Sequence, residues 1–450
     1  MVQTLRAQIL SRDANPGPAT EAIEEAMRLL PDDPRPKLVA SHIFTFAGAP
    51  QRAADLWMEA SRQAPELARM GDRYVMSALA ERLIEIGDRT RADRISSRLG
   101  EIGFSASLAP DRSASALART RQAVRDQNGS EALTSVTAIA DPDDLLKLYI
   151  DRRYAALWPR ISEWAGSDLA AQSLRYLQEL RSDWIAADDF RTAVPYALRL
   201  SKLRDHSAVV QLFLPMFDRI RPDAREEGAE RLAPIVARSL AVLGRVREAQ
   251  VLLDKTAASM PANDGNALNI DGAYITLATL QVDWPQVITR SDLFLNRARL
   301  FGKSINQAGI VQDQAWRACA LWQTGRQGDA QQATVEVLAG AALFPGPAMS
   351  LHICRGDKDA GRKLLLARLA DENTREWALH YIQPESTDAA TPLENLMKPT
   401  EQAVRTSPDV ISAANEVGRI LPHPVDDAMP AGFDPFRAKI TTKPVDPGAI

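Results

Sequence analysis

The sequence predicts an all-α protein, on the strength of three observations. Ala, Leu, Arg and Glu, which are good helix formers, dominate the 450 residues. Strict alternation of Val, Ile, Thr and Tyr, the pattern of a half-buried strand, is hard to find. Small, bulky and proline residues also recur 34 residues apart near the N-terminus. Because 450 residues are too many for one ordinary compact core, we expect either about three domains or an elongated array of repeats.

The repeat is clearest in residues 1–67, where six positions match across 34 residues: Ala19 with Ala53, Ile23 with Trp57, Ala26 with Ala60, Pro31 with Pro65, Ala7 with Ser41, and Leu10 with Phe44. Two antiparallel helices approach closely only where the facing residues are small, and bulky residues fill the space beside that contact. Gly48 is expected to end one helix and Pro50 to begin the next. The remaining apolar face of each helix pair must be covered by the next pair, so the pairs should stack.

A 34-residue unit with these residues resembles the tetratricopeptide repeat (TPR), a helix-turn-helix unit, in the degenerate form typical of bacterial members. The resemblance implies a right-handed α-solenoid of antiparallel helix hairpins, a TPR-like superhelix over most of residues 1–385. Later copies are marked by Ala80, Leu83, Gly87 and Ala92, by Ala237, Leu240, Gly244, Ala249 and Leu253, and by Ala318, Leu321, Gly325 and Ala330.

The repeats predict five regions along the chain. Residues 1–105 are expected to form an N-terminal TPR-like array, and residues 131–385 a central array of helical hairpins. Between them, residues 106–130 mix Pro, Gly and small polar residues, which indicates an irregular joint around a helix from about Ser115 to Asp126. Residues 386–421 are expected to form a cap of two short helices. The Pro-rich residues 422–450 predict an extended or disordered tail, which either docks on a partner or lies back on the array.

Composition excludes several classes of function. The net charge of −4 and the pI of about 5.9 give no field that would hold the chain on nucleic acid or on an anionic membrane. No window approaches 18 consecutive apolar residues, so no membrane span is expected. The two cysteines, Cys319 and Cys354, are interpreted as small buried thiols in helices. Without a signal peptide after Met1 the chain is expected in the cytoplasm, and a leader missing upstream would instead make it periplasmic or exported.

No reactive constellation stands out. The five histidines have no partner at a metal-ligand spacing, and no Walker A, G-x-G-x-x-G, G-x-S-x-G or H-E-x-x-H stretch occurs. We therefore expect a protein that is not an enzyme and that needs no cofactor or metal.

The resemblance also implies a concave groove lined by the first helix of each hairpin. The residues that match its exposed positions are Arg35, His42, Phe46, Tyr74, Glu81, Glu85, Arg231, Arg238, Trp322 and Gln323. Leu38 and His42 stand where some family members have a Lys and Asn clamp for a peptide carboxylate, so that mode of recognition is not expected.

The leading hypothesis is a non-catalytic scaffold for protein–protein interaction that binds a peptide or helical partner in this groove. Two alternatives stay open: an enzyme or small-ligand-binding protein with a site in the degenerate region 130–225, and an accessory subunit of a larger complex.

Overall fold

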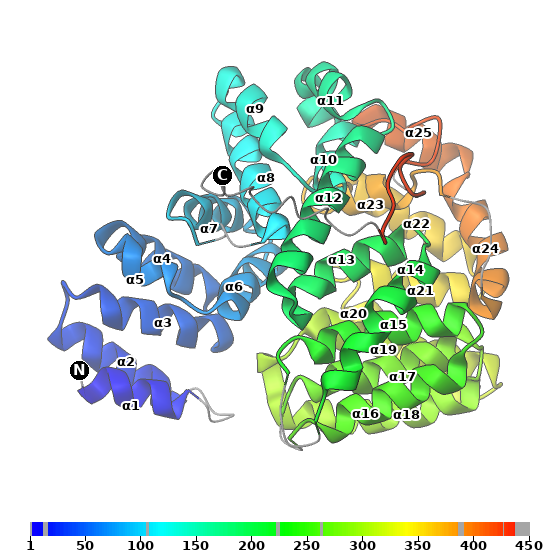
Figure 1. The fold of residues 1–450 in the computed structure, drawn as a ribbon, viewed down its shortest axis with the longest axis horizontal. Helices are drawn as coiled ribbons and strands as arrows, with labels where there is room; N and C mark the ends of the chain where they lie inside the picture. The colour runs from blue at the N-terminus through cyan, green and yellow to red at the C-terminus, as the bar shows by residue number, and fades with distance from the viewer. Residues whose placement is uncertain are drawn as a thin grey trace, which may run out of the picture.

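The computed structural model describes residues 2–11, 17–104, 108–221, 226–261, 264–385, 391–425 and 427–436. In these residues the prediction of an all-α fold is confirmed: they form 25 α-helices and four short 3-10 helices (Figure 1). Their β structure is one isolated bridge between Asp151 and Gly418. None of the described helices is long and apolar enough to cross a lipid bilayer.

The first part of the chain forms a block of antiparallel helices, drawn in blue and cyan in Figure 1. Neighbouring helices pack in chain order, since the strongest contacts join α1 to α2, α3 to α4 and α7 to α8. The helices are α1 (Val2–Leu10), α2 (Gly17–Leu29), α3 (Pro34–Phe46), α4 (Pro50–Gln63), α5 (Pro65–Arg69), α6 (Arg73–Glu85), α7 (Arg89–Glu101), α8 (Ala109–Arg125) and α9 (Gly129–Ser135).

The second part of the chain continues with sixteen further helices, most of them again packed in successive pairs. They are α10 (Pro142–Ile150), α11 (Trp158–Ala165), α12 (Ala170–Ala187), α13 (Phe190–Lys202), α14 (His206–Phe213), α15 (Ala229–Val242), α16 (Val246–Ala258), α17 (Ala267–Leu280), α18 (Trp284–Ala298), α19 (Gln307–Gln323), α20 (Gln327–Ala339), α21 (Pro345–Cys354), α22 (Lys358–Ala370), α23 (Arg375–Tyr381), α24 (Pro392–Arg405) and α25 (Pro408–Val417).

The residues that mark the repeat are buried where helices meet. Ala7, Ala19, Ala26, Ala53 and Ala60 are at most 2% exposed, and so are the bulky residues Ile23, Phe44 and Trp57. Burying each of these bulky side chains contributes roughly 2 kcal/mol to folding. The spacing of small and bulky residues therefore encodes the close approach of the helices, as the sequence predicts.

One kind of turn joins the two helices of most pairs. A residue with positive φ follows the first helix, and the N–H of the next residue donates to a carbonyl five residues earlier, as from Ala49 to Phe44 (3.0 Å) and from Arg245 to Leu240 (2.8 Å). Glycine holds the positive φ at 48, 87, 244, 325 and 356, whereas Gln127, Arg204 and Val282 hold it in three other turns. The described turns mostly lie roughly 40 residues apart, longer than the 34-residue register at the N-terminus.

Residues 106–130 contain more regular structure than the expected joint. Helix α8 begins at Ala109, before the expected start near Ser115, and runs to Arg125. It packs closely against α7 and is followed by α9 through a turn at Gln127. Apolar and small side chains of α8 are buried along most of its length, so this segment extends the packing of the N-terminal helices.

The second part of the chain curves until its end meets its beginning. The backbone of Gly418 lies against α10, and the N–H of Arg419 donates to the carbonyl of Ile150 (2.9 Å). A Cβ at Gly418 would lie 2.3 Å from that same carbonyl oxygen, so only glycine permits this approach. The guanidinium of Arg419 stacks on Tyr149 (3.7 Å) and Trp158 (4.1 Å) and fixes the closure.

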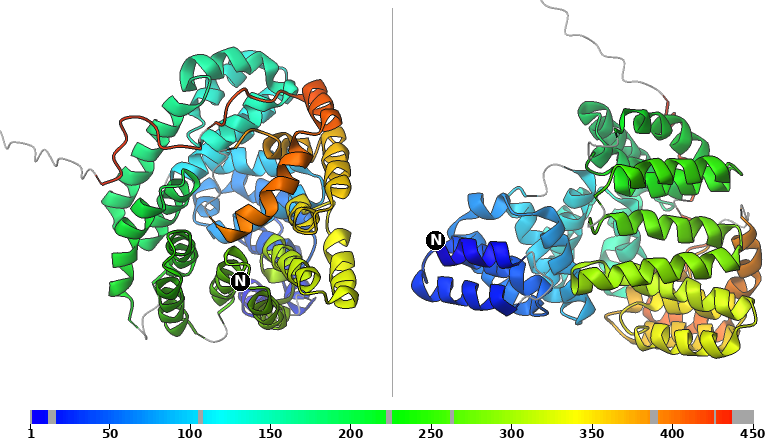
Figure 2. Two further views of the ribbon diagram at one scale, coloured as in Figure 1. Left: turned by 90° about the vertical axis from the view of Figure 1, so that its right-hand side faces the viewer. Right: turned by 90° about the horizontal axis from the view of Figure 1, so that it is seen from below.

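The C-terminal segments lie on the inner side of this curve. Helix α24 contacts α17, α21 and α22, and Figure 2 shows it, in orange, inside the ring of helices. The described residues of the tail, up to Phe436, contain no helix and reach α12 and α13, where Arg181 donates to the carbonyl of Asp434 (2.7 Å). Residues 437–450 of the expected tail lie outside the described residues.

Cys319 and Cys354 form a disulfide, so the interpretation of two separate thiols is wrong. Cys319 lies near the end of α19 and Cys354 ends α21, and both are buried. Their Cα atoms are 5.9 Å apart although 35 residues separate them in the sequence. Only the packing of α19 against α21 brings the two sulfurs together.

Candidate functional sites

An exposed aromatic cluster lies on the first helices of the N-terminal block. His42 and Phe46 are one helical turn apart on α3, and their rings meet edge to face at 5.6 Å. Tyr74, at the start of α6, stacks on Phe46 with ring centroids 6.1 Å apart and an angle of 12° between the planes. The Asp72 carboxylate caps α6 by accepting from the N–H of Tyr74 (2.8 Å). We call His42, Phe46 and Tyr74 the aromatic face; Tyr74 is 56% exposed.

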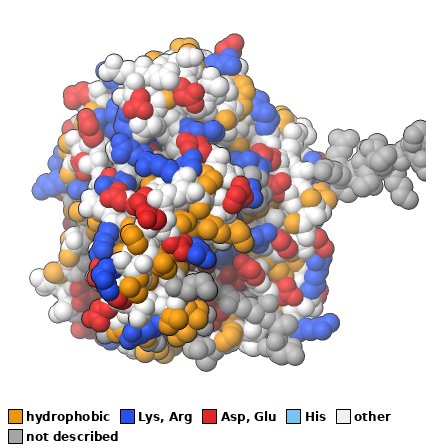
Figure 3. Space-filling model, turned by 90° about the vertical axis from the view of Figure 1, so that its left-hand side faces the viewer, with side chains coloured by type: hydrophobic (Ala, Val, Ile, Leu, Met, Phe, Trp, Pro, Cys, Tyr) orange, Lys and Arg blue, Asp and Glu red, His pale blue; other side chains and the backbone are white. Residues whose placement is uncertain are grey.

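Acidic residues continue along the same helix. Glu85 pairs with Arg82 (2.8 Å), and Arg82 also reaches toward the carbonyl of Ile305 (3.4 Å) in the second part of the chain. Desolvation and the neighbouring Glu85 raise the pKa of Glu81, while Arg82 opposes them. A cation placed beside Glu81 would relieve this repulsion, so the aromatic face borders a position that favours a basic group. The side of the molecule shown in Figure 3 mixes acidic, basic and hydrophobic side chains.

The other sequence-predicted residues lie elsewhere. Arg35 pairs with Asp33, which caps α3 (2.6 Å). Arg231 is exposed on α15. Burial raises the pKa of Asp111, and the guanidinium groups of Arg73, Arg112 and Arg231 only partly offset that rise.

Two further predicted residues lie beside the disulfide. Trp322 is 38% exposed and carries the Arg355 guanidinium over its ring (4.5 Å). The side-chain amide of Gln323 donates to the carbonyl of Cys354 (2.8 Å) and so closes the end of α21. Glu81, Glu85 and the aromatic face lie on α3 and α6 of the N-terminal block, whereas Trp322 and Gln323 lie on α19.

A pocket of about 660 Å³ lies where the two ends of the second part meet. We call it the central pocket; its wall combines α10, α13, α15, α23 and the tail. Most of its cations are paired: Lys202 with Asp143, and Arg204 with Glu394 (3.9 Å). Arg238, one of the predicted groove residues, also lines it and has no ion pair or hydrogen bond with the described residues.

Several groups of the central pocket titrate away from their usual values. Burial, helped by Asp144 and Asp143, raises the pKa of Asp141 to about 6. Burial lowers the pKa of His206, and Arg238 and Arg204 lower it further. The Nδ1 atom of His206 lies 3.1 Å from the hydroxyl of Ser239. The pocket is thus lined by polar groups that can bind a small polar molecule.

The lining of the central pocket runs from Pro110 to Asp427 in the sequence. Of this lining, the sequence predicted only Arg238 and a site somewhere in region 130–225. Residues so far apart in the chain carry no common spacing, and only the closure of the curve brings them together.

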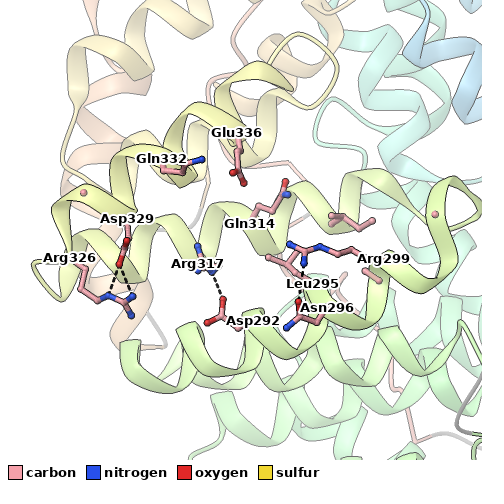
Figure 4. A pocket seen from close by; sticks show the side chains of 14 residues that line it. Asp292, Leu295, Asn296, Arg299, Gln314, Arg317, Arg326, Asp329, Gln332 and Glu336 are labelled. Carbon is pink, nitrogen blue, oxygen red and sulfur yellow. Dashed lines mark hydrogen bonds and ion pairs between the residues drawn. The ribbon is translucent and has the colours of Figure 1, made fainter.

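An open groove of about 880 Å³, the third candidate site after the aromatic face and the central pocket, lies over α19, between α18 and α20 (Figure 4). Its charged side chains largely satisfy one another, as Arg317 pairs with Asp292 (2.6 Å) and Arg326 with Asp329 (2.6 Å). Exposed ion pairs of this kind contribute little to folding stability.

Across the described ranges, no three His, Cys, Asp or Glu side chains are placed so that they could hold a metal ion together. No protein-family model matches this sequence, and a comparison with curated protein sequences finds no match.

Proposed function

We propose that the chain is a right-handed α-solenoid of TPR-like helix pairs and serves as a non-catalytic scaffold for protein–protein interaction. Three features support the solenoid: the buried repeat residues, the common turn with its five-residue hydrogen bond, and apolar side chains that gather in four clusters along the chain. Repeat arrays bury their apolar faces against neighbours in this way.

The aromatic face is where the partner docks. The observation that carries this is the stacked pair of Phe46 and Tyr74, which bridges the first helices of two successive pairs and leaves Tyr74 more than half exposed. Exposed aromatic side chains are the usual anchors of protein interfaces. In the second part of the chain the inner side is already occupied by α24, so the N-terminal block offers the open surface.

The chemistry around the aromatic face defines the partner. An apolar or aromatic side chain would stack beside Phe46 and Tyr74, and a basic side chain would sit near Glu81 and Glu85. The partner is therefore a peptide or amphipathic helix that carries both, and an accessory role in a larger complex would use the same face.

Affinity capture with matched variants tests this proposal. The double variant Phe46→Ala, Tyr74→Ala removes the anchors, whereas Val335→Ala removes another exposed hydrophobic side chain (65% exposed) on α20. Proteins retained by the wild-type chain and by Val335→Ala should be lost from the double variant. If all three chains retain the same proteins, the aromatic face is not the docking surface.

Binding of a small polar molecule is a second candidate function, favoured by the central pocket. Part of its wall comes from residues 130–225, and Arg238 offers a cation without a partner in the described part of the chain. Calorimetric titration with small carboxylates, compared between wild type and Arg238→Gln, tests it. No heat of binding in either chain would remove this candidate.

The disulfide favours the exported location over the cytoplasm. Disulfides persist in oxidising compartments and are rare in the cytosol. Both cysteines are buried where α19 packs against α21, so the disulfide is a structural bond. Alkylation with a maleimide-polyethylene glycol in acid-quenched, denatured cell extracts, with and without prior reduction, measures the state of Cys319 and Cys354. A mass shift without reduction would place the chain in a reducing compartment.

A further inference from the structure

The tail segment 431–436, with the sequence Ala-Gly-Phe-Asp-Pro-Phe, lies on α12 and α13 in the manner of a bound peptide. Its Phe433 is 9% exposed, while the residues on both sides of it are exposed. Phe433 joins the largest apolar cluster, which also contains Tyr196 and Phe213. The Arg181 guanidinium covers the ring of Phe433 at 4.9 Å.

Polar contacts hold the backbone of the same segment. Arg181 donates to the carbonyl of Asp434 (2.7 Å), and the hydroxyl of Tyr196 donates to the carbonyl of Pro435 (3.4 Å). Within the segment, the N–H of Phe436 donates to the Asp434 carboxylate (2.9 Å), which fixes the turn. One inserted aromatic ring with two backbone hydrogen bonds is how domains bind short linear segments.

The tail also borders the central pocket on its way to this site. Val425 and Asp427 are part of the pocket wall, and Met429 packs against the same apolar cluster as Phe433. The tail therefore borders the central pocket at Val425 and Asp427 and reaches α12 and α13 at Phe433. A tail held mainly by one buried ring and two backbone hydrogen bonds can leave without unfolding the helices beneath it.

We propose that the surface of α12 and α13 under Phe433, which we call the tail-docking surface, binds a linear Phe-Asp-Pro segment and is occupied by the chain's own tail. A partner that carries such a segment competes with the tail, and its entry removes the tail from the wall of the central pocket. The tethered tail acts at an effective concentration on the order of millimolar, so the intact chain resists weak competitors. This surface is separate from the aromatic face, so it does not rest on the function proposed above.

A fluorescent peptide of residues 427–436 tests the docking site on the full chain. Phe433→Ala removes the anchor of the resident tail but leaves the residues of α12 and α13 that contact it unchanged. By fluorescence polarisation the peptide should bind this variant at least about tenfold more tightly than it binds the wild-type chain, because the competing tail is weakened. The same peptide with alanine in place of the phenylalanine at position 433 should not bind.

A variant of α12 distinguishes specific recognition of the peptide from non-specific binding. Arg181→Gln combined with Phe433→Ala removes the donor to Asp434 and the cation over the ring, and should reduce peptide affinity about tenfold. Circular dichroism of each chain shows that the helices are retained. Equal binding of the peptide to wild type and Phe433→Ala, or no binding to a helical Phe433→Ala chain, would overturn the proposal.

Discussion

Replacing Glu376 by glutamine should destabilise the fold more than any other single charge change discussed here. Glu376 lies in the first turn of helix α23, and its carboxylate pairs with Arg121 of α8 and Arg89 of α7 (3.5 Å). The side chain of Arg121 is only 7% exposed and also lies near Asp93 (3.7 Å). The Glu376 carboxylate thus links α23 to α7 and α8 of the N-terminal block.

Two lines of reasoning give the size of the effect. Burial alone would raise the pKa of Glu376, but Arg121, Arg89 and Lys147 outweigh it and lower the pKa from 4.5 to about 2. A shift of that size corresponds to about 3 kcal/mol of stabilisation of the charged form. Removing one partner of a buried ion pair typically costs about 3–5 kcal/mol, because the other charge stays buried. We therefore expect Glu376→Gln to lower the free energy of unfolding by about 3 kcal/mol.

Urea unfolding at pH 7, followed by circular dichroism, measures this loss. Glu372→Gln is the matched control, since Glu372 is exposed and only four residues away. Because the pKa of Glu376 is depressed in the folded state, its contribution is present above about pH 4.5 and is lost as the pH falls toward 2. The difference between wild type and Glu376→Gln should shrink over that range. A loss below about 1 kcal/mol at pH 7, as for a surface ion pair, would refute the reasoning.

Three further perturbations have expected outcomes. Burial raises the pKa of Asp313 from 3.8 to about 8, so its neutral form favours the fold at acidic pH and this stability is lost as the pH rises from about 4 to 8. In urea unfolding at pH 8.5, Asp313→Asn should be more stable than wild type by at least about 2 kcal/mol. A difference between the two chains that is no larger at pH 8.5 than at pH 5 would contradict this. Cys319→Ser opens a loop closed across 35 residues and should lower the free energy of unfolding by about 3–4 kcal/mol, whereas an unchanged thermal midpoint would show that the disulfide adds no stability. Gln127 holds a φ of +56° in an exposed turn, so Gln127→Gly should raise the free energy of unfolding and Gly244→Ala, at +77°, should lower it, each by about 1 kcal/mol. Changes of the opposite sign in urea unfolding would contradict this account of the turns.

Local sequence patterns predicted the helix pairs well where the pairing residues are small. Ala53 and Trp57 are spaced for one face of a helix, and this face is buried as expected. Gly48 and Pro50 mark a turn because a glycine accepts positive φ and a proline suits the first turn of a helix. The sequence did not predict the turn at Arg204, because no glycine marks it. The surrounding packing holds Arg204 at the positive φ that glycine adopts in the other turns.

The candidate sites were less predictable. His42 and Phe46 could be placed together from their spacing on one helix, and the repeat register placed Tyr74 on the next first helix. Arg238 was identified as a groove residue, but its neighbours in the central pocket come from helices and tail segments hundreds of residues apart. Gln323, predicted from the repeat register to line the groove, donates its side-chain amide to the carbonyl of Cys354 at the end of α21.

By itself, the sequence determined that the chain is helical, where many helices pair, and which side chains face their partners, because helical period and turn chemistry act over a few residues. The tertiary structure alone decided that Cys319 bonds to Cys354, that Glu376 reaches Arg121, and that the tail lies on α12 and α13. Such contacts depend on how small rotations between successive helix pairs add up along the chain. No short stretch of residues records that sum, so the closure and the sites it creates appear only in the folded molecule.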